Sequence, residues 1–84
     1  MTIAFAPAVP FEAPRLRSPR EHLVRAAAAL WRVVDRRERV IGHLRLVESA
    51  DGVRYSAERY HRGSERFVSV GSFWSADDAV AALR

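Results

Sequence analysis

Arginine side chains recur between apolar residues through the middle of this chain, and arginine is well suited to binding phosphates and base edges. All 14 cationic residues of the 84-residue sequence are Arg, and the formal net charge is +4. The planar guanidinium can donate two parallel hydrogen bonds to a phosphate or to the edge of guanine. Strand alternation would bring several such polar side chains to one face of a sheet. These candidate DNA-contacting residues are Arg32, Arg36, His43, Arg45, Arg54, Ser56 and Ser69. The chemistry that they predict is binding rather than catalysis.

The arginine bias has a second explanation that the sequence leaves open. The chain has no Lys, Asn or Gln, a composition that is also typical of a GC-rich genome. The charge is uneven along the chain. Residues 1–47 hold nine Arg and four acidic residues, whereas residues 48–84 hold five Arg and six acidic residues. Such a basic excess permits contact with nucleic acid without demanding it.

No set of residues in the sequence has the spacing of a catalytic or metal site. His22, His43 and His61 are scattered, with no second ligand at metal-binding spacing. The chain has no Cys, no nucleophile elbow and no Gly-rich loop before a helix. Asp77 and Asp78 are better explained as residues at a helix start than as acid–base catalysts. We therefore expect a protein that is not an enzyme and that has no catalytic residue, metal or cofactor.

The first part of the chain differs in composition from the rest. Residues 1–17 hold three of the four prolines, which predicts an extended, disordered tail before a single domain at 18–84. Phe5 and Phe11 make this tail apolar enough to dock on a partner. The sequence shows neither a membrane-spanning apolar run nor an ordinary signal peptide, so it predicts a cytoplasmic protein that does not enter a membrane.

Residues 18–30 carry the signals of an N-terminal helix. Ser18 is a suitable N-cap, Pro19 fits the first helical position, and Glu21 completes a capping box. A run of four alanines follows, and alanine has the highest helix propensity. The segment 31–48 is ambiguous, because it could extend this helix or form a hairpin. Its β-branched and aromatic content favours the hairpin.

The second half of the chain has clearer signals. Asp51-Gly52 predicts a tight turn between two strands. The expected strands span 31–36, 40–48, 53–61 and 66–73. Ser75 is the N-cap of a C-terminal helix whose apolar stripe is Ala76, Ala79, Val80 and Leu83. The expected fold class is α+β, with an N-terminal helix, an antiparallel meander of three to four strands, and a C-terminal helix packed on one sheet face.

Helices on one side would leave the other face of this sheet open to water. Alternation assigns the rings of Tyr60 and Phe67 to the open face beside the seven candidate residues, so basic and aromatic side chains interleave there. Alternation also sets Val40, Val53 and Val68 inward. Glu58 falls on the open face and opposes phosphate binding. An ordinary solvated sheet surface explains the same pattern.

The segment 53–83 resembles a known DNA-binding domain. The matching residues are Tyr55-Ser56-Ala57-Glu58 and Gly71-Ser72-Phe73, followed by Ser75, Asp77, Asp78 and Ala79. This pattern is similar to the three-stranded-sheet-plus-helix domain of plant ethylene-response factors and to the arm-binding domain of tyrosine recombinases. The resemblance implies a sheet in the major groove of DNA. The base-reading residues that it implies are Arg45, Arg54, Ser56 and Ser69. The chain departs from the family by its extra N-terminal elements and by Glu58 on the reading face.

A second resemblance concerns the same C-terminal stretch. Val68-Ser69-Val70-Gly71-Ser72-Phe73, followed by Ser75 and an Ala-rich helix, is similar to one half of a sporulation-related (SPOR) repeat domain. That family binds peptidoglycan glycans. The second copy of the motif and an export signal are missing, so we rank this resemblance below the first.

Two functional hypotheses follow from the sequence. The first is a small non-enzymatic DNA-binding accessory protein of phage or mobile-element type, whose partner is double-stranded DNA. The alternative is a protein–protein interaction module that binds a protein partner or a second copy of itself. The residues that would carry the alternative are Phe5, Phe11 and Trp74.

Overall fold

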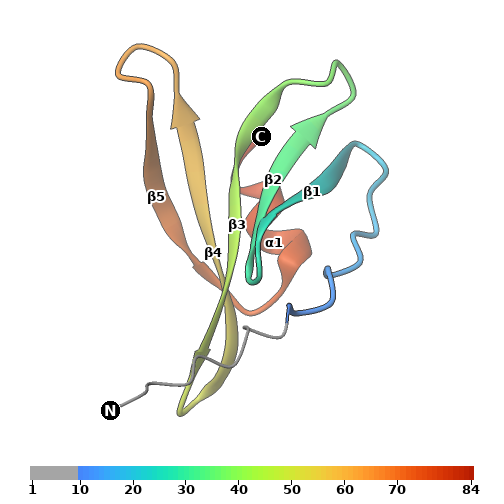
Figure 1. Cartoon of the computed structure of the whole chain (residues 1–84), viewed down its shortest axis with the longest axis vertical. Helices are drawn as coiled ribbons and strands as arrows, with labels where there is room; N and C mark the ends of the chain where they lie inside the picture. The colour runs from blue at the N-terminus through green and yellow to red at the C-terminus, as the bar shows by residue number, and fades with distance from the viewer. Residues whose placement is uncertain (1–9) are drawn as a thin grey trace, which may run out of the picture.

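The chain forms a five-stranded antiparallel sheet with one short helix on one of its faces (Figure 1). The structure is a computed structural model that describes residues 10–84. Its elements are β1 (Glu21–Ala27), β2 (Leu30–Asp35), β3 (Val40–Ser49), β4 (Gly52–His61), β5 (Arg66–Phe73) and α1 (Ala76–Ala81). Each strand pairs with the next one along the chain, so the order across the sheet is β1-β2-β3-β4-β5.

The predicted N-terminal helix is wrong, and so is the fold class that contained it. Residues 21–27 form strand β1, and Ala28 and Ala29 form the turn into β2. Ser18 Oγ accepts a hydrogen bond from the backbone N–H of Arg20 at 3.2 Å, so it closes a local turn instead of capping a helix. Pairing with β2 overrides the helix propensity of alanine, because an isolated helix of this length is marginal in water. The described chain is therefore mostly β, with α1 as its one helix.

The four strands expected between residues 31 and 73 are present as β2 to β5, but β1 adds a fifth, so the expected number of three to four strands is wrong. The ambiguous segment is a hairpin, since β2 and β3 pair antiparallel on either side of a turn. Ser49 pairs with Gly52 at the turn between β3 and β4, as Asp51-Gly52 predicted. Gly52 has a φ of +119°, a conformation that L side chains rarely adopt, which explains the glycine there. The last strand, β5, covers the expected range.

Helix α1 begins where the sequence predicted. Ser75 Oγ accepts a hydrogen bond from the backbone N–H of Asp78 at 3.1 Å, which caps the first turn. The four residues of the predicted apolar stripe are all buried. They form the core with Val33, Leu44 and Ala57 of the sheet. The helix packs against β3, β4 and β5 and leaves the opposite sheet face without a covering helix.

Bulges alter the alternation that the sequence suggested. One extra residue stands in β1 at Ala26, in β3 at Ile41 and in β5 at Val70, because the pairing register shifts at each of these points. Ile41 and Val70 pack against the core as a result. Val40, which alternation set inward, instead lines a groove between β3 and β4.

Two other inward assignments are also corrected. Val53 and Val68 are exposed. They lie near strand ends, and α1, which is only six residues long, packs elsewhere on the sheet.

Residues 10–20 run beside β1 and the β1–β2 turn (Figure 1). Phe11 donates its backbone N–H to the carbonyl of Ala28 at 3.0 Å. Arg17 donates its backbone N–H to Asp77 Oδ1 at the start of α1, at 2.8 Å. These contacts tie the segment to the sheet and to the helix. The division of the chain into a tail and a domain stays a prediction.

Candidate nucleic-acid interface

The sheet face opposite α1 carries no helix, and we call it the uncovered face. Strand register aligns its side chains in rows: Arg32 pairs with His43, His43 with Glu58, and Glu58 with Ser69. The uncovered face comprises Arg32, His43, Arg45, Arg54, Ser56, Glu58, Tyr60, Phe67, Ser69 and Trp74. All of the candidate DNA-contacting residues except Arg36 thus share one face. Their role in binding stays a prediction.

Arg36 lies in the β2–β3 turn, in a recess that it shares with Arg20, Arg37 and Arg39. This turn forms because the carboxylate of Asp35 accepts the backbone N–H groups of Arg37 and Arg39, each at 2.9 Å. The hydrogen bond from Arg39 is the main reason that the pKa of Asp35 lies below its usual value. Arg36 therefore belongs to a turn rather than to the uncovered face.

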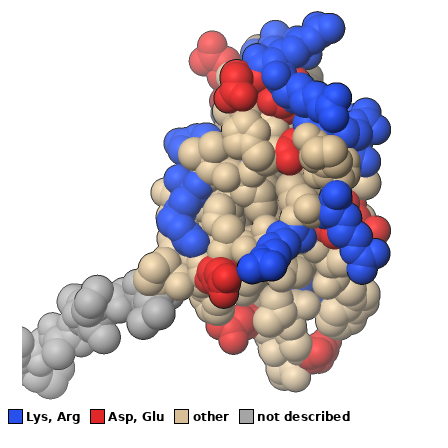
Figure 2. All heavy atoms as spheres, turned by 90° about the vertical axis from the view of Figure 1, so that its right-hand side faces the viewer, with Lys and Arg blue, Asp and Glu red and all other residues tan. Residues whose placement is uncertain are grey.

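Arginine side chains gather at one end of the molecule, where the β2–β3 and β4–β5 turns lie (Figure 2). The residues that line recesses there include Arg20, Arg36, Arg37, Arg39 and Arg62. Acidic residues of the same turns are interspersed among them. The positive charge of the protein is therefore not confined to the uncovered face.

The centre of the uncovered face is a group of rings. The imidazole of His43 lies parallel to the ring of Phe67, with centroids 3.7 Å apart and planes 7° apart. Tyr60 is tilted against Phe67 with a centroid distance of 5.1 Å. Phe67 remains 38% exposed in spite of these two contacts. Such rings can stack on nucleic-acid bases.

Glu58, the acidic residue of this face, is balanced by its neighbours. Its Oε1 lies 3.5 Å from Nη2 of Arg45 and 3.7 Å from Nδ1 of His43. Burial lowers the pKa of His43; the Glu58 carboxylate opposes that shift, while Arg32 and Arg45 add to it. His43 is thus held neutral near pH 7, and Arg45 is the cation that offsets Glu58.

Trp74 extends the face beyond the end of β5. The guanidinium carbon of Arg54 lies 4.2 Å from the Trp74 ring centroid. Trp74 is 62% exposed, the most exposed large apolar residue of the described chain. The sequence reasoning assigned it only to partner binding. Of the other two residues of that assignment, Phe11 is exposed and Phe5 lies outside the described residues.

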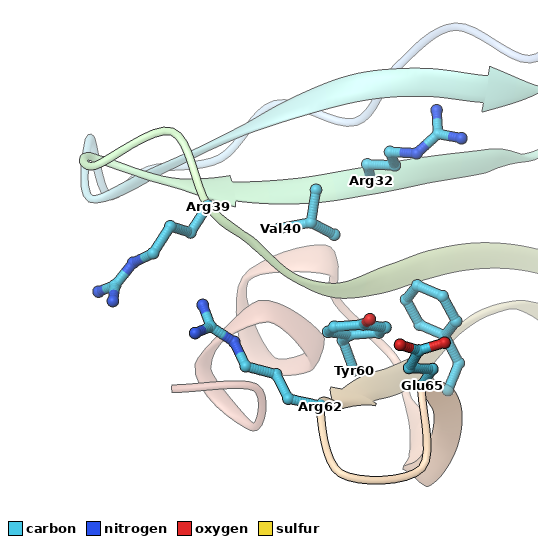
Figure 3. Close-up of a pocket in the computed structure, with 7 residues that line it drawn as sticks. Arg32, Arg39, Val40, Tyr60, Arg62 and Glu65 are labelled. Atoms are coloured by element: carbon cyan, nitrogen blue, oxygen red, sulfur yellow. The ribbon is translucent and has the colours of Figure 1, made fainter.

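A groove of about 630 Å³ opens between β3 and β4 (Figure 3). It is lined by Arg32, Arg39, Val40, Tyr60, Arg62, Glu65 and Phe67. We call it the β3–β4 groove. It exists because the pairing of β3 with β4 ends at Gly42 and Arg59, whereas β4 continues to pair with β5 as far as His61. The sheet therefore splits into two hairpins at this end.

The sequence reasoning missed Arg39 and Arg62, although a signal for them was present. Continuing the register that Asp51-Gly52 sets places Arg39 directly opposite Arg62. Like charges directly opposite one another destabilise strand pairing. The bulge at Ile41 adds local twist at the same point. Both effects explain why the strands part here.

Nowhere among residues 10–84 do three His, Asp or Glu side chains come together in a way that could hold a metal ion. The described chain also contains no helix with the length and apolar character needed to cross a membrane.

Comparison with known proteins gives no match to a family model, to a curated protein or to a solved structure. The two resemblances drawn from the sequence, and the DNA contacts that the first implies, therefore stay predictions.

Proposed function

We propose that this protein is a small, non-enzymatic, cytoplasmic protein that binds nucleic acid through its uncovered face, as a DNA-binding accessory protein would. The observation that carries the proposal is the register of the sheet. It brings Arg32, Arg45 and Arg54 onto the same helix-free face as the exposed rings of Phe67 and Trp74.

This combination suits nucleic acid for two physical reasons. Guanidinium groups that bind phosphates release condensed counterions, which favours binding at low salt. Exposed rings stack on bases, at about 1–3 kcal/mol per base. The Arg54–Trp74 pair offers both properties at one place, since the cation lies on the ring and both groups reach solvent.

The test is fluorescence anisotropy of a labelled 20-nucleotide DNA of random sequence. The DNA is used both as a duplex and as a single strand, at salt concentrations from 20 to 200 mM. We expect the logarithm of the affinity to fall linearly with the logarithm of the salt concentration. Arg45→Ala and Arg54→Ala each remove one phosphate contact, so each should weaken binding and reduce the salt slope by about 1.

Arg15→Ala is the matched control, because it removes the same charge from the exposed N-terminal segment and not from the sheet. It should change the affinity by about twofold or less. Equal losses in the control and in the two sheet variants would show that only net charge matters. Such a result would remove the uncovered face as the binding site.

A second candidate function is favoured by the exposure of Trp74. Val47 and Val53, which lie on the β3–β4 hairpin, are also exposed, so this end of the sheet could dock a protein partner or a second copy of the chain. Sedimentation of the chain alone tests self-association. A dimer that Trp74→Ala dissociates would favour this candidate over nucleic acid.

A further inference from the structure

The β3–β4 groove has a cationic end and an aromatic end (Figure 3). At one end the guanidinium of Arg62 is turned toward the side of the groove where Arg39 lies. At the other end lie the rings of Tyr60 and Phe67, with Glu65 beside Tyr60 and with Arg32 on the β2 side of the groove. A ligand that fits this arrangement carries a negative charge at one end and a flat ring at the other.

The two arginines of the cationic end have hydrogen-bonding capacity to spare. Arg39 donates its Nε to Asp35 Oδ2 at 3.3 Å, which leaves its two terminal nitrogens for another acceptor. Arg62 forms no ion pair with any other described residue. The guanidinium groups of Arg39 and Arg62 come from opposite walls of the groove and carry like charges, and an anion between them relieves their repulsion.

A second recess adjoins the groove. It shares Arg39, Val40, Tyr60 and Arg62 with the groove, and it is also lined by Leu83. Across this notch the backbones of β3 and β4 are not paired. A planar group can therefore enter beside the Tyr60 ring without displacing strand hydrogen bonds.

We propose that the β3–β4 groove binds one nucleotide of a single-stranded nucleic acid, with its phosphate between Arg39 and Arg62 and its base against Tyr60 and Phe67. This inference rests on the proposed nucleic-acid function and specifies its ligand. A paired and stacked duplex does not offer a free base face, whereas a single strand does.

The test compares the binding of a fluorescein-labelled 15-nucleotide single-stranded DNA with that of the matching duplex. The full chain is added to each DNA, and the fluorescence anisotropy of the label is measured. Arg62→Ala removes the phosphate contact from an exposed turn, where little folding free energy is at stake. We expect the wild-type chain to bind the single strand about tenfold more tightly than the duplex. Arg62→Ala should weaken single-strand binding by about tenfold, as expected for a lost charge-assisted hydrogen bond, and duplex binding by about twofold.

Arg66→Ala is the control for charge, because Arg66 lies in the same hairpin, opposite His61, and does not line the groove. Its effect on both DNA forms should be about twofold or less. Tyr60→Phe, which keeps the ring, should bind as the wild type does, and Tyr60→Ala should not. Thermal melting of each variant shows that the fold is retained.

Two results would overturn the inference, and they are distinguishable. If Arg62→Ala and Arg66→Ala weaken both DNA forms equally, nucleic-acid binding stands but the groove is not its site. If neither DNA form binds at 20 mM salt, the proposed function fails together with this inference.

Discussion

The imidazole of His43 lies flat on the ring of Phe67, with a centroid distance of 3.7 Å and an interplanar angle of 7°. Phe67 also lines the β3–β4 groove. The ring of Phe67 therefore connects two parts of the candidate interface, namely the row of polar residues at the centre of the uncovered face and the groove at its split end. A change at His43 should therefore reach the groove through Phe67, and also through Arg32, which pairs with His43 and lines the groove.

The first prediction concerns pH. Burial lowers the pKa of His43 below its ordinary value of 6.5, so the folded chain takes up a proton at this site less readily than the unfolded chain. The stabilisation is complete above about pH 6.5 and is lost as the pH falls from there toward the folded-state pKa. We expect a lower melting temperature at pH 5 than at pH 7.5.

His43→Gln tests the source of this pH dependence. The variant lacks the titrating ring, so the difference in melting temperature between pH 5 and pH 7.5 should shrink. Asp35, the carboxyl group with a lowered pKa, titrates below this range and contributes little to the comparison. An undiminished difference in His43→Gln would assign the pH dependence to other groups.

The second prediction uses the two tryptophans. Trp31 is 1% exposed and lies under Arg25, whereas Trp74 is 62% exposed and lies on Arg54. Trp74→Ala should change the free energy of unfolding by less than about 1 kcal/mol, because little buried contact is lost. If bases stack on Trp74, single-stranded DNA should quench part of the wild-type emission and none of the emission of Trp74→Ala. Equal quenching in both proteins would contradict base stacking at this residue.

The third prediction concerns Gly42, which lies under the C-terminal end of the chain. A Cβ at this position would collide with the backbone carbonyl oxygen of Glu58, and it would lie 2.9 Å from both terminal methyl groups of Leu83. Gly42→Ala should therefore lower the free energy of unfolding by about 1–3 kcal/mol, measured by urea denaturation. Gly63→Ala is the control, since Gly63 lies in an exposed turn and its nearest contact is a side-chain atom, in the ring of His61 at 3.1 Å, and not backbone. A similar small change in both variants would show that the strands at Gly42 can move apart at little cost.

Local signals predicted the C-terminal half of this fold well. Asp51-Gly52 set the register of β3 and β4, and Ser75 set the start of α1, because both act through hydrogen bonds within a few residues. The same kind of reasoning failed at Ser18, where an equally good capping pattern precedes a strand. The two segments differ in what determines their structure. Residues 21–27 form a strand because they pair with β2, and the residues around Ser18 carry no local signal for that pairing.

The candidate site was predicted as far as strict alternation holds. Arg32, Arg45 and Arg54 share one face because the register through the middle of the sheet is regular. The groove was not predicted, because it depends on where strands stop pairing. The bulge at Ile41 turns that residue toward the core and leaves Val40 at the groove. Gly42, a residue type that often marks a bulge in a strand, follows it directly, but it does not tell which neighbouring residue is the extra one.

The last prediction concerns the ion pair that joins the start of β1 to the C-terminal end of the chain. Arg84 donates Nη2 to Oε1 of Glu21 at 3.0 Å and Nε to both carboxylate oxygens, at 3.2 and 3.3 Å. The Glu21 side chain is only 5% exposed, and its hydrogen bond raises the pKa of the Arg84 guanidinium. Arg84→Ala leaves a poorly hydrated carboxylate without its cation, so it should cost about 1–2 kcal/mol of unfolding free energy.

Glu21→Gln separates loss of the pair from loss of packing, because the amide keeps the shape of the side chain without its charge. The double variant Glu21→Gln/Arg84→Ala leaves no unpaired charge, so it should be more stable than Arg84→Ala alone. Urea denaturation of the four proteins gives the coupling free energy directly. If the two single changes simply add, the pair does not stabilise the fold, and β1 is held in place by its pairing with β2 and by Leu23 against the core.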